Sequence, residues 1–133
     1  MQDHPTPAEI LAAVAAFLRA DVVADITPHA VFQAKVSANA LDIARRDLEL
    51  SPAADAEELA RLHRLLGRNG DLLDLTRELA QRIADGAMTL ETPGLAEHLW
   101  ATTLAKLAVD QPAYSGYRAA LAERTNHNPE GDT

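Results

Sequence analysis

The chain has 133 residues, a formal net charge of −8, no cysteine and 4% aromatic residues. This length predicts one domain with its own core, and the missing cysteines exclude disulfides, thiolate nucleophiles and cysteine-ligated metals. The acidic balance argues against a nucleic acid or an anionic membrane as the main partner, because both require a basic surface. Alanine and leucine dominate the apolar residues, which favours helix.

Membrane and export signals are missing from the sequence. No apolar run approaches the roughly 18 to 20 residues that span a bilayer. The start, MQDHPTPAE, lacks the basic and then apolar order of a secretory signal. We therefore expect a cytoplasmic protein that does not associate with a membrane.

A serine or threonine followed by proline marks four predicted helix starts. In each pair the hydroxyl residue would be the N-cap and the proline would take the first helical position, where its missing N–H costs nothing. Glu9 would complete a capping box with the first of these threonines. A fifth start is expected at Asp71, after the break at 67–70. The four pairs are Thr6-Pro7, Thr27-Pro28, Ser51-Pro52 and Thr92-Pro93.

Apolar residues recur at helical spacing after each start. They predict helices over about 7–22, 28–49, 53–66, 72–85 and 93–110, with a short sixth at 114–123. The helix over 93–110 is apolar nearly all round, which is typical of a central helix. The inward faces of the first two helices are predicted to hold Ile10, Leu11, Val14, Phe17 and Leu18, and Phe32, Val36, Ala40, Ile43 and Leu50.

These elements predict an all-α fold, an antiparallel helical bundle of five main helices plus a short C-terminal sixth. The short connections suit antiparallel neighbours. Residues 1–124 are expected to form a single domain. Residues 125–133 have no apolar anchor and are expected to be a disordered tail.

The usual catalytic and metal-binding motifs do not occur. Of the five histidines, His29 lies four residues from an acid, Asp25, and that pair is better explained by local capping at a helix start. His63 is expected to be a half-buried, hydrogen-bonded residue. Residues 55–85 have a helix-turn-helix outline but carry seven acids against five arginines, so a plain αα-hairpin is preferred. We expect no metal, no cofactor and, in the leading interpretation, no enzymatic activity.

The two lysines of the chain lie in its most apolar helices. Asn39 falls inside the apolar stripe of its helix, while Lys35 and Arg46 border that stripe. Polar groups on core faces need partners, because an unpaired buried charge or amide costs several kcal/mol. A buried or cleft-lining polar cluster is therefore predicted, with a structural or a functional role. Its members are Asp21, Lys35, Asn39, Lys106 and Asp110, and Lys106 is expected to pair with Asp110, Asp21 or Asn39.

Three stretches of the chain resemble a bacterial family of small uncharacterised helical domains: HPTPAEILAAVAAFLRADV, FQAKVSANALDIARRDLE and LAKLAVDQPAYSGY. Together they span about residues 5–117. Members of that family are found beside aminoglycoside-phosphotransferase-like proteins and acyl-CoA dehydrogenases. The resemblance implies an accessory of a kinase-like enzyme in acyl-CoA metabolism, and it assigns no catalytic residue.

Two functions from different classes follow. The leading hypothesis is a non-enzymatic accessory domain that binds a protein partner, either a phosphotransferase-like protein or a second copy of itself. The alternative is a small ligand-binding or catalytic bundle that uses the polar cluster around Lys106 and Asn39, for instance on an acyl or phosphate group. The first predicts an exposed apolar patch, and the second a concave pocket lined by polar groups.

Overall fold

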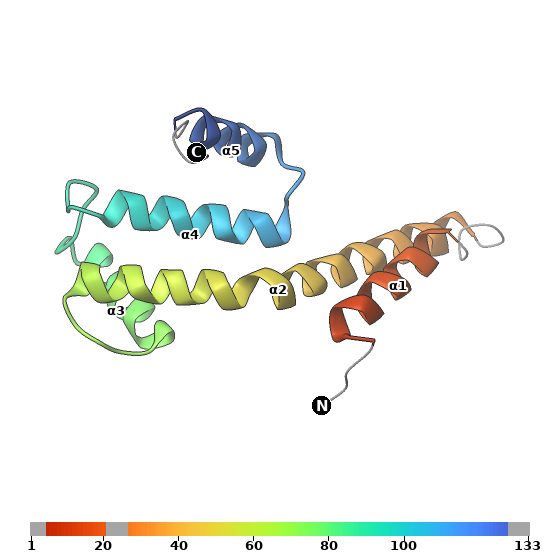
Figure 1. Ribbon diagram of the computed structural model, residues 1–133, viewed down its shortest axis with the longest axis horizontal. Helices are drawn as coiled ribbons and strands as arrows, with labels where there is room; N and C mark the ends of the chain where they lie inside the picture. Colours follow the sequence, from red (N-terminus) through yellow and green to blue (C-terminus); the bar gives the residue numbers. More distant parts are fainter. Residues whose placement is uncertain (1–4, 21–26, 128–133) are drawn as a thin grey trace, which may run out of the picture. The chain divides into compact units, whose positions relative to one another are not determined.

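The structure, a computed structural model, describes residues 5–20 and 27–127, and within them it contains helices and no strand (Figure 1). The predicted all-α class is therefore confirmed for the described residues, and the antiparallel bundle stays a prediction. The helices are α1 (Pro7–Ala20), α2 (Pro28–Leu66), α3 (Leu72–Ala84), α4 (Leu95–Asp110) and α5 (Ser115–His127).

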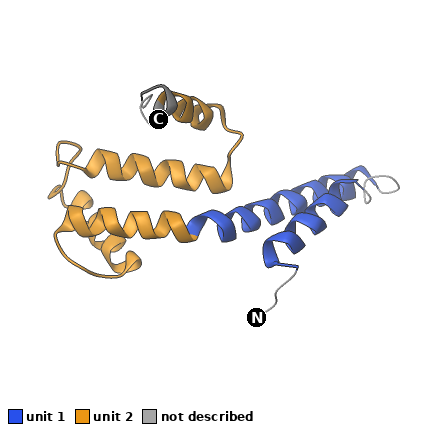
Figure 2. Ribbon diagram, in the orientation of Figure 1, with its two compact units in different colours: residues 1–51 blue, residues 52–133 orange. Residues whose placement is uncertain are grey.

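The chain divides into two compact units, Met1–Ser51 and Pro52–Thr133 (Figure 2). We call them unit 1 and unit 2 and describe each by itself, so the single domain over 1–124 stays a prediction. The boundary predicted between this domain and a tail falls inside α5, because that helix continues to His127. The rest of the predicted tail lies outside the described residues.

The predicted break at Ser51-Pro52 is wrong, because α2 runs unbroken through both residues. The Ser51 hydroxyl donates to Asp47 Oδ1, one turn earlier, at 2.5 Å, and does not cap a new helix. A proline inside a helix removes one backbone hydrogen bond and crowds the carbonyl four residues before it, here that of Leu48. Strong helix formers on both sides, such as Ala53 and Leu59, offset this cost. Five helices are therefore described, where six were predicted.

The predicted start at Thr92-Pro93 is two residues early, because α4 begins at Leu95. Thr92 Oγ1 accepts from the Thr89 amide at 3.0 Å and so closes the preceding turn. Gly94 is the N-cap, and its φ of 86° lies in the left-handed region that glycine adopts without a steric penalty. The turn between Thr89 and Gly94 therefore sets where α4 begins.

The other helix starts are confirmed. The Glu9 amide donates to Thr6 Oγ1 at 3.2 Å, and Glu9 Oε2 accepts from the Thr6 amide at 2.6 Å, as in a capping box. Thr27 Oγ1 accepts from the Ala30 amide at 3.3 Å. Asp71 caps α3, and this hydrogen bond from the Asp74 amide lowers the pKa of the Asp71 carboxyl.

In unit 1 the seam between α1 and the first half of α2 is made of small residues. The buried apolar side chains are those of Ala15, Ala34 and Ala38. Most of the larger residues predicted to face inward instead lie at the surface, among them Ile10 and Phe32, whereas Leu11 and Leu18 are half-buried. The predicted inward face of α2 is therefore wrong, and that of α1 is right only for Leu11 and Leu18. A seam of alanines permits close approach of two helices but buries little apolar area per residue.

Unit 2 has a core of large apolar side chains from the second half of α2, from α3 and from the segment leading into α4. Leu62 and Leu75 are fully buried, and Leu59, Leu65 and Leu72 pack against the cluster. The helix α4 is less central than predicted, because Leu99 and Trp100 are exposed. Within the described parts of the chain, no helix combines the length and the apolarity needed to cross a membrane. The core consists of Leu62, Leu66, Leu75, Leu79, Met88 and Leu95.

Candidate functional site

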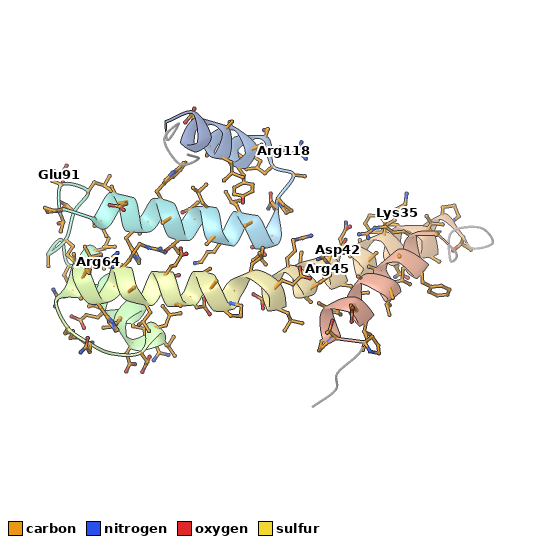
Figure 3. All side chains as sticks on the ribbon, in the orientation of Figure 1. Lys35, Asp42, Arg45, Arg64, Glu91 and Arg118 are labelled. Atoms are coloured by element: carbon orange, nitrogen blue, oxygen red, sulfur yellow. The ribbon has the colours of Figure 1, made fainter. Side chains whose placement is uncertain are left out.

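The members of the predicted polar cluster that belong to unit 1 lie at its surface or outside the described residues. Asp21 is outside them. Lys35 is exposed on α2 (Figure 3). Asn39 Oδ1 accepts a hydrogen bond from Arg19 Nη2 at 3.1 Å, and the same nitrogen lies 2.5 Å from Asp42 Oδ2. Asn39 thus contributes to a polar contact between α1 and α2.

The other two members, Lys106 and Asp110, belong to α4 in unit 2 and are exposed. They are four residues apart, but no ion pair joins them, and neither side chain hydrogen-bonds to another described residue. Among the four members that the structure describes, no hydrogen bond or ion pair joins two of them within unit 1 or within unit 2. Whether the cluster has a function stays a prediction.

Large apolar side chains form two exposed stripes in unit 1. On α1 the stripe contains Ile10, Val14 and Phe17, at helical spacing. On α2 it contains Phe32, Val36, Ile43 and Leu50, which are 65%, 50%, 37% and 42% exposed. Exposed apolar residues that share one helix face often mark interaction sites, whereas single ones are normal on any surface.

Unit 2 contains a groove between the second half of α2 and the start of α4. A cavity of about 130 Å³ is lined by Arg61, Arg64 and Leu65 on α2 and by Gly94, Glu97 and His98 at the start of α4. A second cavity, of about 340 Å³, lies between α2, α4 and α5. Arg61 and Glu97 line both cavities, so the two adjoin. Alanines and leucines supply most of the second lining, with Tyr117 from α5.

Three polar side-chain atoms of α2 and α4 in unit 2 are buried without a hydrogen-bond partner among the described residues: Arg61 Nε, His98 Nδ1 and Thr102 Oγ1. The His98 side chain belongs to a residue that is 4% exposed, and Thr102 lies one turn later on α4. The nearest acid to Arg61 in an ion pair is Glu57, but the two are 3.8 Å apart, beyond good hydrogen-bond distance. Buried polar atoms normally have hydrogen-bond partners, so these three atoms are available to bond to a ligand.

Burial lowers the pKa of His98, and the Arg61 guanidinium lowers it further, while the Glu58 carboxylate acts in the opposite direction. The imidazole is therefore neutral at pH 7. The sequence reasoning missed His98, although a single histidine among the apolar residues of helix 93–110 was a usable signal. It also missed Arg61, which adjoins the fully buried Leu62.

The histidine that the sequence did single out, His63, is structural. It is half-buried, and its Nε2 lies 3.0 Å from the carbonyl oxygen of Gly70 in the break before α3. This confirms the prediction of a hydrogen-bonded, half-buried residue. Among the side chains in residues 5–20 and 27–123, no group of three or more His, Asp or Glu could hold a metal ion.

Comparison with known families finds one match, over residues 24–114, to a family described as a domain of unknown function, DUF6285. The chain belongs to the DUF6285 family. No curated protein and no solved structure matches it. The match confirms the expectation of an uncharacterised small domain.

The region that matches DUF6285 includes α2, α3 and α4 but neither α1 nor α5. All residues named above that line the smaller cavity of unit 2 lie within it, as do those of the α2 stripe. The larger cavity also uses Tyr117 and Leu121, which lie beyond the match.

Proposed function

We propose that this DUF6285 chain is an accessory domain that binds a protein partner through the exposed apolar stripe of α2 in unit 1. The observation that carries the proposal is the exposure of Phe32, Val36, Ile43 and Leu50 on one face of a helix. Full burial of such a side chain contributes about 1.5 to 3 kcal/mol, and roughly half of that remains available here because the four residues are 37% to 65% exposed. The alanine seam of unit 1 leaves all four available for a partner.

The surroundings of the stripe indicate what the partner surface contains. Lys35 and Arg46 lie along one border of the stripe, by the helical positions of these residues. A complementary surface would have an apolar ridge with acidic residues beside it, as an amphipathic helix has. We take this helix to belong to a phosphotransferase-like protein linked to acyl-CoA metabolism. That choice rests on the resemblance of the three sequence stretches described above.

The test is a binding experiment between the purified chain and the phosphotransferase-like protein encoded in the same genome. Size exclusion with light scattering should detect a one-to-one complex at micromolar concentration. The double variant Phe32→Ser, Val36→Ser should weaken the complex at least about tenfold, because two central apolar contacts are lost. The matched control is Leu90→Ser, at a residue that is 69% exposed in a turn of unit 2, and it should leave binding unchanged.

The same experiment tests a second candidate partner for the α2 stripe, which is another copy of this chain. A dimer of the chain alone that the double variant dissociates would assign the stripe to self-association and would contradict the phosphotransferase-like partner. A strict monomer that forms no complex would contradict the proposed function altogether.

Catalysis or ligand binding by a polar cluster around Lys106 and Asn39 was the alternative. Asn39 belongs to unit 1, where it bonds to Arg19, and Lys106 belongs to unit 2, where no described residue pairs with its ammonium group. No contact within either unit favours this alternative, so the protein-binding proposal is preferred.

A further inference from the structure

We propose that the groove of unit 2 binds a small amphipathic organic anion, with its charged group between Arg61, Arg64 and His98 and its apolar part in the cavity between α2, α4 and α5. This site is separate from the α2 stripe, and the proposal does not depend on a protein partner.

The charged end of the site rests on donors that lack partners. Arg61 Nε and His98 Nδ1 are both buried, and neither has a hydrogen-bond partner among the described residues. The Arg61 side chain is 15% exposed, and its acid Glu57 is 3.8 Å away and 77% exposed, so the guanidinium is only weakly neutralised. Arg64 lines the same cavity and adds a second positive charge (Figure 3). An oxyanion would supply an acceptor for Arg61 Nε and, in the tautomer that carries the hydrogen on Nδ1, for His98.

The start of α4 contributes to the same end of the groove. Gly94 lines the smaller cavity as the N-cap of α4 and makes no side-chain capping hydrogen bond. The positive end of the helix dipole therefore adjoins the arginines. The helix end alone would not define a site, but the buried and unpaired His98 in the same lining is an independent indication.

Two acidic residues oppose an anion here, because Glu57 and Glu97 both line the larger cavity. Glu97 lines both cavities and forms no ion pair with Arg61 within 4.0 Å. Its carboxylate lowers the local positive potential, so its removal should strengthen binding. Removing an arginine charge should therefore weaken anion binding, and removing the Glu97 charge should strengthen it.

The other end is the larger cavity, of about 340 Å³, whose lining is mixed: alanines and leucines form its apolar side, and Glu57, Arg61, Glu97 and Tyr117 add polar groups. This size lies within the range of about 300 to 1,000 Å³ that is typical of small-molecule sites. Ala101, Ala105 and Ala108 line it along α4, and Tyr117 lines it from α5. The shared lining by Arg61 and Glu97 places the charged and apolar ends side by side, which favours a ligand with both characters over inorganic phosphate alone.

The test is calorimetric titration of the full chain with hexanoate and with hexyl phosphate, which distinguish a carboxylate from a phosphate head group. Acetate and inorganic phosphate carry only the charge, and hexan-1-ol only the apolar part. At least one of the two amphipathic anions should bind at least about tenfold more tightly than each of these fragments, because both cavities are then filled. If neither binds more tightly than its fragments, the proposal is wrong.

Variants then locate the site. Arg61→Gln should weaken binding of the amphipathic anion about tenfold, and Arg64→Gln severalfold, because each removes a charged donor. Glu97→Gln should strengthen binding severalfold. The matched control is Arg77→Gln on α3, which makes the same charge change at a side chain that is 71% exposed and does not line the groove, and it should have no effect. Equal weakening by Arg64→Gln and Arg77→Gln would mean unspecific charge attraction and would overturn the proposal.

Two further measurements separate binding from folding. Arg64 and Glu97 are exposed, so their variants should keep the helical dichroism spectrum and the thermal midpoint of the parent. Ala105→Leu, which reduces the larger cavity, should weaken hexanoate or hexyl phosphate but not acetate or inorganic phosphate. If buried waters alone satisfy Arg61 and His98, none of these anions will bind, and the proposal fails.

Discussion

In unit 1 the seam between α1 and α2 is filled by Ala15, Ala34 and Ala38, whereas in unit 2 leucines and Met88 fill the space between α2, α3 and the start of α4. Larger apolar residues are present in unit 1, but many of them lie on its surface: Ile10, Val14, Phe17, Phe32, Val36 and Ile43. Unit 2 therefore derives its stability from buried apolar area, and unit 1 from close backbone approach and a polar contact at Arg19. An amphipathic helix need not turn its bulkiest face toward its nearest neighbour.

The largest expected effect is on the core of unit 2. Leu75→Ala should lower the free energy of unfolding by about 2 to 5 kcal/mol, because Leu75 is fully buried and the cavity left behind cannot collapse completely. Urea unfolding followed by the fluorescence of Trp100, the only tryptophan, measures it. The control is Leu73→Ala on the same helix, at a residue that is 58% exposed, where a change of about 0.5 kcal/mol or less is expected. Equal losses would contradict the assigned core.

The alanine seam of unit 1 should be destabilised by a larger side chain, whereas the core of unit 2 is destabilised by a smaller one. Ala38→Leu should lower the free energy of unfolding by about 1 to 3 kcal/mol, because a fully buried alanine leaves no room for three further carbons. Far-ultraviolet dichroism during urea unfolding is the measurement. Ala40→Leu, two residues along the same helix at an exposed position, is the matched control and should be neutral. A neutral Ala38→Leu would mean that the seam is not closely packed.

The continuity of α2 between the two units can be tested at Pro52. Pro52→Ala should raise the free energy of unfolding by about 1 to 2 kcal/mol, because alanine restores a backbone hydrogen bond and removes the clash inside the helix. The gain is less than the full interior penalty, since alanine also frees the unfolded chain. Thermal unfolding followed by dichroism would measure it. A loss of stability would support the rejected prediction that Pro52 begins a new helix.

The smallest expected effect is a loss of stability in unit 2 at acid pH. Burial lowers the pKa of His98 below its value near 6.5 in the unfolded chain, so the unfolded state binds the proton more readily. The contribution of His98 to stability is therefore complete above about pH 6.5 and is lost as the pH falls toward the lowered pKa. Urea unfolding at pH 7 and at pH 5 should show lower stability at pH 5. His98→Gln should reduce that difference, and an unchanged difference would contradict the assignment.

Much of the helical framework could be predicted from sequence. Local capping chemistry defined the starts at Thr6, Thr27 and Asp71, because an N-cap needs only a short polar side chain and the amides that follow it. The same rule was wrong at Ser51-Pro52, where helix formers on both sides outweigh the proline. At Thr92-Pro93 the rule placed the helix start two residues too early, because a turn that ends at Gly94 precedes α4.

The faces of the helices and the groove could not be predicted in the same way. Periodicity identifies an apolar face but not which neighbour covers it, and in unit 1 the small residues face the seam instead. Arg61 and His98 are 37 positions apart in sequence and meet only because α4 packs along the second half of α2. A pairing of that kind depends on tertiary packing, which single-helix patterns do not contain.

The alanine seam has a consequence for how unit 1 finds its register. The three buried alanines offer small side chains to interlock, so they constrain a slide by one turn, ~5.4 Å, less than large side chains would. Arg19 opposes such a slide, because its guanidinium donates to Asn39 at 3.1 Å and to Asp42 at 2.5 Å. A slide of one turn would separate it from both. One arginine thus helps to fix the alignment of α1 on α2, which the small alanine methyl groups define only weakly.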